Sequence, residues 1–247
     1  MKLFNCAIPI RLAFLTLLVG LTGCASLSPM ALNSDSKTLD VSSKSVLLMT
    51  LDVFRSDGSR HHPNPKSISF EKRNATDKAE IKTFKIEDAD TLESKAGREV
   101  YLLSLDLEPG QYKLTGINGD ANAFPFHGVF FVPLLMDVSI QKNVVTYIGR
   151  VKAELRPRQG NEFRAGGVIP LIDQAVSGVS TGTFDIAVED FSKEDIPFFR
   201  TTYPALTKTE IHTDFLPPFD RAKVQQWWEN DYKSDAQLPA KKGSTKE

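Results

Sequence analysis

The sequence predicts a mainly β protein, an antiparallel β-sandwich with a short C-terminal α-helical extension. The first observation is that about nine strand-like segments follow one another between residues 46 and 190, separated by turn residues as in sandwich folds. The second is the alternation in Glu99–Leu107, where Tyr101 and three leucines share one face. The third is a change to helical spacing after residue 190, which is strongest at residues 221–232.

The expected strands differ in how their sequences mark them. In some segments apolar and polar residues alternate, which predicts a strand with one polar face. Other segments are apolar throughout and have the length of a strand buried on both faces. Pro125 and Pro133 mark the aromatic segment 123–133 as an irregular or edge strand. The other strands are expected at residues 46–54, 66–72, 80–86, 99–107, 112–117, 134–140, 144–155 and 183–189, with loops at 60–65, 87–98 and 156–167. Residues 168–176 fit the end of a strand or a short helix.

Turn residues indicate how several strands are connected. Glu108–Gln111 has proline and glycine at the two central positions of a type II turn, so the strands on either side are expected to form a hairpin. Residues 141–143 predict a second hairpin, and Asn118–Asp120 predicts a further turn.

Two helices are expected after the sandwich. Ser192 with Asp195 three residues later is close to a capping box, which predicts a helix from Lys193 to about Arg200. Asp220 is the expected cap of a helix over residues 221–232, with Val224, Trp227 and Trp228 on one face. We expect the extension, residues 191–232, to cover an open end or an exposed edge of the sandwich.

A basic and apolar leader opens the chain. Lys2 lies near the start, and Arg11 directly precedes an apolar run at residues 12–20. The small residues Thr22 and Gly23 follow the run. This is the layout of a secretory signal. The run is shorter than the roughly 20 residues that a membrane-spanning helix needs.

The segment Leu21-Thr22-Gly23-Cys24 resembles the lipobox of bacterial lipoproteins. The resemblance implies that residues 1–23 are a signal peptide cleaved after Gly23, and that the Cys24 thiol and the new amino terminus are acylated. It also implies attachment to the outer membrane, facing the periplasm, because Ala25 replaces the aspartate that would favour inner-membrane retention. The alternatives are a plain signal peptide with an incidental cysteine and a buried N-terminal helix.

Four further segments complete the expected organisation. Residues 24–45 are rich in Ser, Asp and Lys and are expected to be a flexible tether. The sandwich is expected at 46–190 and the helical extension at 191–232. The polar, Lys-rich tail at 233–247 is expected to be disordered.

A second resemblance concerns the fold. Leu107-Glu108-Pro109-Gly110-Gln111-Tyr112-Lys113-Leu114 is similar to the hairpin of transthyretin-like and carboxypeptidase-regulatory-like β-sandwiches, and of a domain found in several bacterial lipoproteins. The match covers about eight residues of the sandwich and implies a fold, not an activity.

Charge argues against one class of partner, and cysteine content indicates how the domain is stabilised. The leader holds two of the 30 basic residues and none of the 31 acidic ones, so the mature chain has a net charge of −3. No basic face is evident, and we expect no nucleic-acid partner. Cys6 leaves with the leader and Cys24 is used for lipid, so core packing has to hold the domain together without disulfides.

The sequence contains no recognisable catalytic, cofactor or metal motif. There is no nucleophile elbow, no zinc-protease pair of histidines and no phosphate-binding loop. His61 and His62 are adjacent in a Pro-rich loop and are expected to be solvated, and His127 is expected to be a partly buried core histidine. Asp137 and Asp173 are candidate acids without a nucleophile motif beside them. We therefore assign no catalytic residue, cofactor or metal ligand.

Two groups of residues are candidate interaction sites. Arg156, Arg158 and Arg164 could bind an anionic partner such as a lipid headgroup, a lipopolysaccharide phosphate or a glycan, and a solvated loop is the favoured alternative. Phe124, Phe126 and Phe130, with Trp228 from the helix, could form an exposed apolar patch. The favoured alternative is that the core and the terminal helices cover both faces of this segment.

Three functions remain open at this point. The favoured one is a lipid-anchored, non-enzymatic module that contacts another envelope component, a protein or a glycan. The second is a binding protein for an apolar or anionic small molecule or lipid. The third is an envelope hydrolase whose site is dispersed along the sequence.

Overall fold

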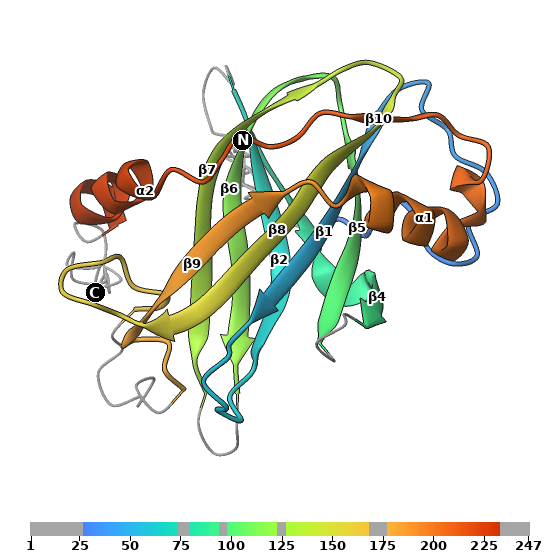
Figure 1. Ribbon diagram of the computed structural model, residues 1–247. Coiled ribbons are helices and arrows are strands. Elements are labelled where there is room, and N and C mark those ends of the chain that lie inside the picture. The colour runs from blue at the N-terminus through green and yellow to red at the C-terminus, as the bar shows by residue number, and fades with distance from the viewer. Residues whose placement is uncertain (1–26, 74–79, 94–97, 123–126, 168–176, 233–247) are drawn as a thin grey trace, which may run out of the picture.

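The computed structural model describes residues 27–73, 80–93, 98–122, 127–167 and 177–232. Two β-sheets pack face to face, and the two main helices lie on opposite sides of the molecule (Figure 1). The predicted fold class, mainly β with two sheets and a short helical C-terminal part, is confirmed.

The smaller sheet has four antiparallel strands in the order β3-β2-β6-β7. Its strands are β2 (Pro63–Lys72), β3 (Glu80–Lys85), β6 (Gly110–Ala121) and β7 (Val129–Ile140), and a short helical turn, η1 (Ile86–Asp88), follows β3. The turn expected at Asn118–Asp120 lies inside β6, so that expectation is wrong. Gly119 serves close packing there, because a Cβ atom would collide with the Phe130 ring and the Asn64 carbonyl.

The larger sheet has six strands in the order β10-β8-β1-β5-β4, with β9 also paired to β8. Its strands are β1 (Ser45–Phe54), β4 (Asp90–Glu93), β5 (Glu99–Leu107), β8 (Val145–Pro157), β9 (Gly182–Glu189) and β10 (Ile211–Thr213). One edge of β8 pairs with β1, and β9 and β10 share the other edge. Short β10 therefore extends the sheet beside the first residues of β8.

Two strand pairs depart from the expected antiparallel pattern. β1 and β8 are parallel, with Val46 opposite Val145, and β10 and β8 are parallel as well. A parallel pair needs a long connection. Between β1 and β8 the chain supplies it by building the whole smaller sheet first.

Both expected hairpins are wrong. The Pro109–Gly110 turn connects β5 of the larger sheet to β6 of the smaller one, and residues 141–143 connect β7 to β8 across the same gap. Leu105 and Leu114, before and after the first turn, are both fully buried in the core between the sheets. The turn sequence specifies a reversal of chain direction, and burial of the apolar faces decides whether the two strands pair or face each other.

Strand β1 is buried on both of its faces. Leu47, Met49 and Leu51 point into the core between the sheets, where rings such as Phe70 and Phe84 pack edge to face with centroids 6.2 Å apart. Val46 and Leu48 point to the opposite face of the larger sheet. They belong there to a second apolar cluster with Leu32, Leu102, Val145, Tyr147, Phe199, Tyr203 and Leu206.

Two elements cover this outer face. One is α1 (Ser192–Thr202) with the short turn η2 (Pro204–Leu206). The other is the N-terminal segment, residues 31–41, which runs beside them (Figure 1). Ser192 is not the cap of α1, because the helix begins at Ser192 and its N-cap position is Phe191. The Asp190 carboxylate instead accepts a hydrogen bond from the Ser192 N–H at 2.9 Å.

The second helix, α2 (Arg221–Trp227), continues into a π-helical turn, η3 (Trp228–Tyr232). Its predicted cap is confirmed, since the Asp220 carboxylate accepts a hydrogen bond from the Lys223 N–H at 2.9 Å. This helix packs near β7, where the Trp227 ring lies 6.0 Å from that of Phe131. None of the helices within the described ranges is long and apolar enough to cross a bilayer.

Residues 27–44 do not form the free tether that we expected over 24–45. The Ser28 N–H donates to Thr83 O of β3 at 2.8 Å, and Ser28 O accepts from the Lys85 N–H at 2.9 Å. Ala31 then donates to Ser104 O of β5 at 2.7 Å, and Leu32 is buried. Residues 27–32, here called the N-terminal strap, thus join an edge strand of one sheet to a strand of the other. The polar composition concealed this, because the strap is held mainly by backbone hydrogen bonds.

A buried ionic network fixes α1 to the larger sheet. Asp195, which is fully buried, accepts hydrogen bonds from Thr50 Oγ1 at 2.5 Å and from Tyr147 OH at 2.6 Å. It also pairs with the guanidinium of Arg150, which stacks on the Phe191 ring with its centre 4.0 Å from the ring centroid. Burial and the bond to Asp195 raise the pKa of Tyr147, so its hydroxyl stays protonated.

We expect Asp195→Asn to destabilise the protein by about 3 kcal/mol, because it leaves the Arg150 charge buried without a counter-ion. Equilibrium urea unfolding followed by circular dichroism measures this change. The matched control is Glu194→Gln, an exposed neighbour on the same helix turn, which should change the free energy of unfolding very little. Equal effects of the two substitutions would contradict the role given to Asp195.

Candidate functional site

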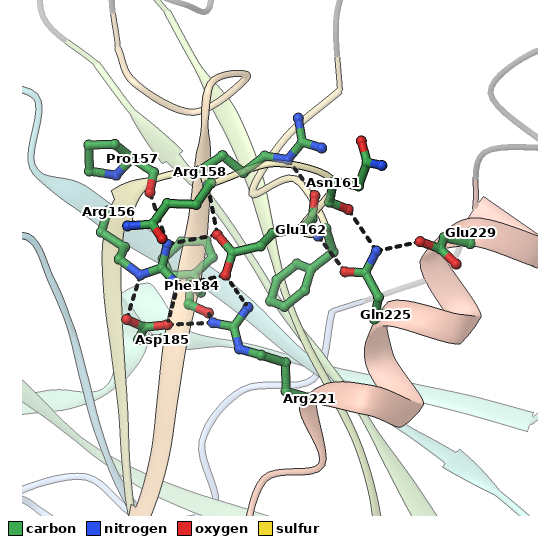
Figure 2. Close-up of polar contacts among 12 residues, drawn as sticks. Arg156, Pro157, Arg158, Asn161, Glu162, Phe184, Asp185, Arg221, Gln225 and Glu229 are labelled. Carbon is green, nitrogen blue, oxygen red and sulfur yellow. Dashed lines mark hydrogen bonds and ion pairs between the residues drawn. The ribbon is translucent and has the colours of Figure 1, made fainter.

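The arginine loop predicted from residues 156–167 forms part of a cluster of intramolecular ion pairs, which Figure 2 shows. The Arg156 guanidinium donates to both Glu162 carboxylate oxygens at 2.8 Å and to Asp185 Oδ2 at 2.5 Å. Arg221, the first residue of α2, pairs with the same two acids and donates to Phe184 O at 2.8 Å. Two arginines and two carboxylates thus join the loop, β9 and α2.

The contacts of Glu162 stabilise its ionised form. The hydrogen bonds from Arg156 are the main cause that lowers the pKa of Glu162, to about 2, and the Gln159 N–H and the charge of Arg221 act in the same direction. The same carboxylates raise the pKa of Arg156. Glu162 and Arg156 are therefore both ionised at neutral pH.

Gln225 attaches the tip of the same loop to α2. Its Oε1 accepts from the Phe163 N–H at 2.7 Å, and its Nε2 donates to Asn161 O and to Glu229 Oε1, each at 2.7 Å. These contacts stand beside the arginine cluster in Figure 2. The 156–167 loop and α2 are therefore joined by these hydrogen bonds as well as by the arginine cluster.

The other two predicted arginines also bind within the chain. The Arg158 Nε donates to Glu162 O, and its guanidinium lies 5.4 Å from the centroid of the Trp228 ring. Arg164 donates to Ser180 O at 2.5 Å. All three arginines thus contact other parts of the chain: Arg156 pairs with Glu162 and Asp185, Arg158 lies over Trp228, and Arg164 binds Ser180.

The two aromatic candidates that the structure describes, Phe130 and Trp228, are core residues. Phe130 is 3% exposed and packs on Phe184, with centroids 5.3 Å apart, while Phe131 is half-buried under Trp227 of α2. Trp228 is 4% exposed and belongs to the core between the sheets. These placements fit the alternative in which core and helix cover both faces, and Phe124 and Phe126 lie outside the described residues.

Two of the three histidines considered, His61 and His127, are not where the sequence suggested. His127, expected in the core, is exposed, and its Nδ1 lies 3.1 Å from Asn122 Oδ1, because the chain around it is a connection at the end of the sandwich. His61, expected in solvent, is buried, and its carbonyl accepts from Arg55 at 3.2 Å. His62 is exposed.

One of the two candidate acids lies in the described part of the chain. Asp137 is exposed and pairs with Arg73, and Asp173 lies outside the described residues. In the part of the chain that the structure describes, no group of three or more His, Cys, Asp or Glu side chains is placed to hold a metal ion.

A hollow of about 500 Å³, the end hollow, opens where β1 ends and where β2 and β5 begin. Its size is within the usual range for small-molecule sites. It is lined by Val53, Phe54, Arg55, His62, Pro63, Arg98, Glu99 and Tyr101.

A second buried acid shapes this hollow. Asp52, 1% exposed, pairs with Arg98 Nη2 at 2.7 Å, and the Arg98 guanidinium stacks on the Phe54 ring, 3.9 Å from its centroid. Burial raises the pKa of Tyr101, which therefore presents a protonated hydroxyl and an aromatic face. Our sequence reasoning missed this site. The available signal was Asp52 itself, a single acid inside the apolar run of β1.

Comparison with known proteins adds little. No family model matches the sequence, and no curated protein matches it. Among solved structures, a leucine-rich repeat protein from Bacteroides thetaiotaomicron shares 8% identity at a TM-score of 0.30. The similarity covers 46% of this chain and 14% of that one, and no inference rests on it.

We expect Glu162→Gln to lower the free energy of unfolding at pH 7 by about 1–2 kcal/mol, because it weakens charge-assisted hydrogen bonds to Arg156 and Arg221. The pKa of Glu162 falls from 4.5 to about 2 on folding, so its stabilisation is complete above pH 4.5 and is lost as the pH falls towards 2. Urea unfolding at a series of pH values measures both effects.

The control for this prediction is Glu210→Gln, since Glu210 is 84% exposed. It should leave both the stability at pH 7 and the acid dependence unchanged. A Glu162→Gln variant that loses stability between pH 4.5 and 2 as steeply as the unmodified protein would contradict the assignment.

Proposed function

We propose that the chain is a bacterial lipoprotein, attached to the outer membrane through lipid on Cys24 and facing the periplasm, whose β-sandwich is a non-enzymatic module that contacts another envelope protein or a glycan. The observation that carries the proposal is the lipobox, Leu21–Cys24, behind a basic and apolar leader. Several acyl chains make such an anchor stable, because each buried methylene contributes about 0.8 kcal/mol.

The described structure supports a role in contact rather than in chemistry. The candidate arginines Arg156, Arg158 and Arg164 join one segment of the chain to another. Rigid scaffolds of this kind present loops and end surfaces for recognition.

The anchor is tested by metabolic labelling with an alkynyl fatty acid and mass spectrometry of the mature N-terminal peptide. We expect label on the unmodified protein, and its complete loss in Cys24→Ser, because that substitution removes the thiol that accepts the lipid. Cys6→Ser is the matched control and should keep the label, since Cys6 belongs to the leader. Undiminished labelling of Cys24→Ser would contradict the proposal.

A second candidate function is the binding of an apolar, anionic small molecule in the end hollow. The observation that favours it is the lining itself, in which the faces of Phe54 and Tyr101 stand beside two guanidinium groups, those of Arg55 and Arg98. Arg55 and Arg98 already have acidic partners, Asp57 and Asp52 respectively, and Arg98 covers one face of Phe54. The Tyr101 ring would therefore supply most of the affinity.

The dye 8-anilinonaphthalene-1-sulfonate, an apolar anion, tests this candidate by fluorescence titration. We expect one bound dye per chain and a loss of about fivefold in affinity for Tyr101→Ala, which corresponds to about 1 kcal/mol. Phe198→Ala removes an aromatic side chain that is 46% exposed on α1 and serves as the control. Equal binding by the two variants would argue against the end hollow as a site.

A further inference from the structure

The N-terminal strap places the lipid-bearing cysteine close to one surface of the domain. Four residues of chain lead from Cys24 to Ser28, and fully extended they span about 14 Å at most. Ser28 is fixed to β3 by two backbone hydrogen bonds, with Thr83 and Lys85. A 20-residue flexible tether would have spanned about 25 Å on average and left the domain free to turn. The strap removes that freedom.

The surface nearest to Ser28 is the outermost strand of the smaller sheet, whose edge Ser28 pairs at Thr83 and Lys85. β3 is the outermost strand there, and Ser28 forms an isolated parallel bridge with Phe84. Phe84 is fully buried, so the residues that alternate with it, including Ile81, point away from the core. The same alternation directs Leu27 outward, because it precedes Ser28 on the paired chain.

Two exposed apolar side chains mark this edge. Leu27 is 51% exposed and Ile81 is 57% exposed, and they are two of the five large apolar residues with substantial exposure in the described ranges. The other three are dispersed over β7, α1 and the segment after β10: Val129, Phe198 and Phe215.

Four lysines around the edge are paired with acids, whereas Glu71, opposite Ile81 on β2, has no ion pair within the described residues. Lys82 pairs with Asp106 at 2.9 Å, and Lys85 pairs with Asp88 at 3.0 Å. Lys66 and Lys72, on neighbouring β2, pair with Glu87 at 2.7 Å and with Glu108 at 2.8 Å. An edge with paired lysines and two apolar side chains suits a zwitterionic lipid surface, because it neither needs anionic lipid nor exposes a row of unpaired acids.

We propose that Leu27 and the outer side of β3, Glu80–Lys85, form a membrane-facing surface that rests on the headgroups of the leaflet holding the acyl chains of Cys24. Leu27 and Ile81 enter the interfacial region, near the point where the strap pairs with β3. This inference rests on the proposed lipidation of Cys24. Its partner is a lipid bilayer with neutral headgroups.

Site-directed fluorescence on the lipidated full-length protein tests the proposal. Cys24 is blocked by lipid and Cys6 is removed with the leader, so a new cysteine accepts an environment-sensitive NBD label selectively. The variants are Ile81→Cys and Val129→Cys. Both positions are 57% exposed, and they lie on the two opposite edge strands of the same sheet.

The labelled proteins are reconstituted in phosphatidylcholine vesicles that contain a lipid with a nitroxide on its headgroup. We expect a blue-shifted emission and strong quenching for the Ile81→Cys label, and neither for the Val129→Cys label. Equal quenching at the two positions, or none at Ile81→Cys in vesicle-bound protein, would overturn the proposal.

An insertion tests the role of the short connection. Ten Gly and Ser residues placed between Ser26 and Leu27 should leave the protein on the vesicles and abolish the quenching at Ile81→Cys, whereas undiminished quenching would overturn the argument from reach. The proposed function fails in a different way. If the protein neither floats with vesicles nor carries the mass of acyl chains, the anchor itself is refuted.

Discussion

The fold depends on a larger sheet whose central strand, β1, must be kept from water on both faces. The smaller sheet covers one face, and the N-terminal segment together with α1 covers the other. Apolar burial drives this arrangement, and the Asp195–Arg150 pair makes the position of α1 specific. A helix that was expected to cap an end or an edge is therefore the outer layer of the protein.

The sequence predicted most strands and both helices because period and cap residues are local signals. The alternation in β5 and the Asp220 cap needed no knowledge of the rest of the chain. Strand partners were not predictable in this way. The turns at Pro109–Gly110 and at residues 141–143 mark chain reversals in either a hairpin or a crossing between sheets, and only the total burial of both sheets distinguishes the two.

At the candidate sites, too, the residues were predictable from the local sequence, whereas their partners, which are distant in sequence, were not. Arg156 and Arg158 were identifiable as a basic loop, but their partners Asp185 and Trp228 lie 29 or more residues away in sequence. Asp52 and Asp195 gave a clearer signal of a buried ion pair, because an acid on an apolar face requires a counter-charge. The strap was missed because main-chain hydrogen bonds leave little trace in composition.

The parallel pairing of β1 with β8 also affects how the chain must fold. Val46 meets Val145, so the central strand of the larger sheet waits for a partner synthesised long after it. Contacts this distant in sequence slow folding, and they leave apolar strands exposed meanwhile. α1, which carries Asp195, emerges later still. The chain therefore reaches a protected state only when its C-terminal third is present, and a product that lacks this third would expose the outer face of β1 to aggregation.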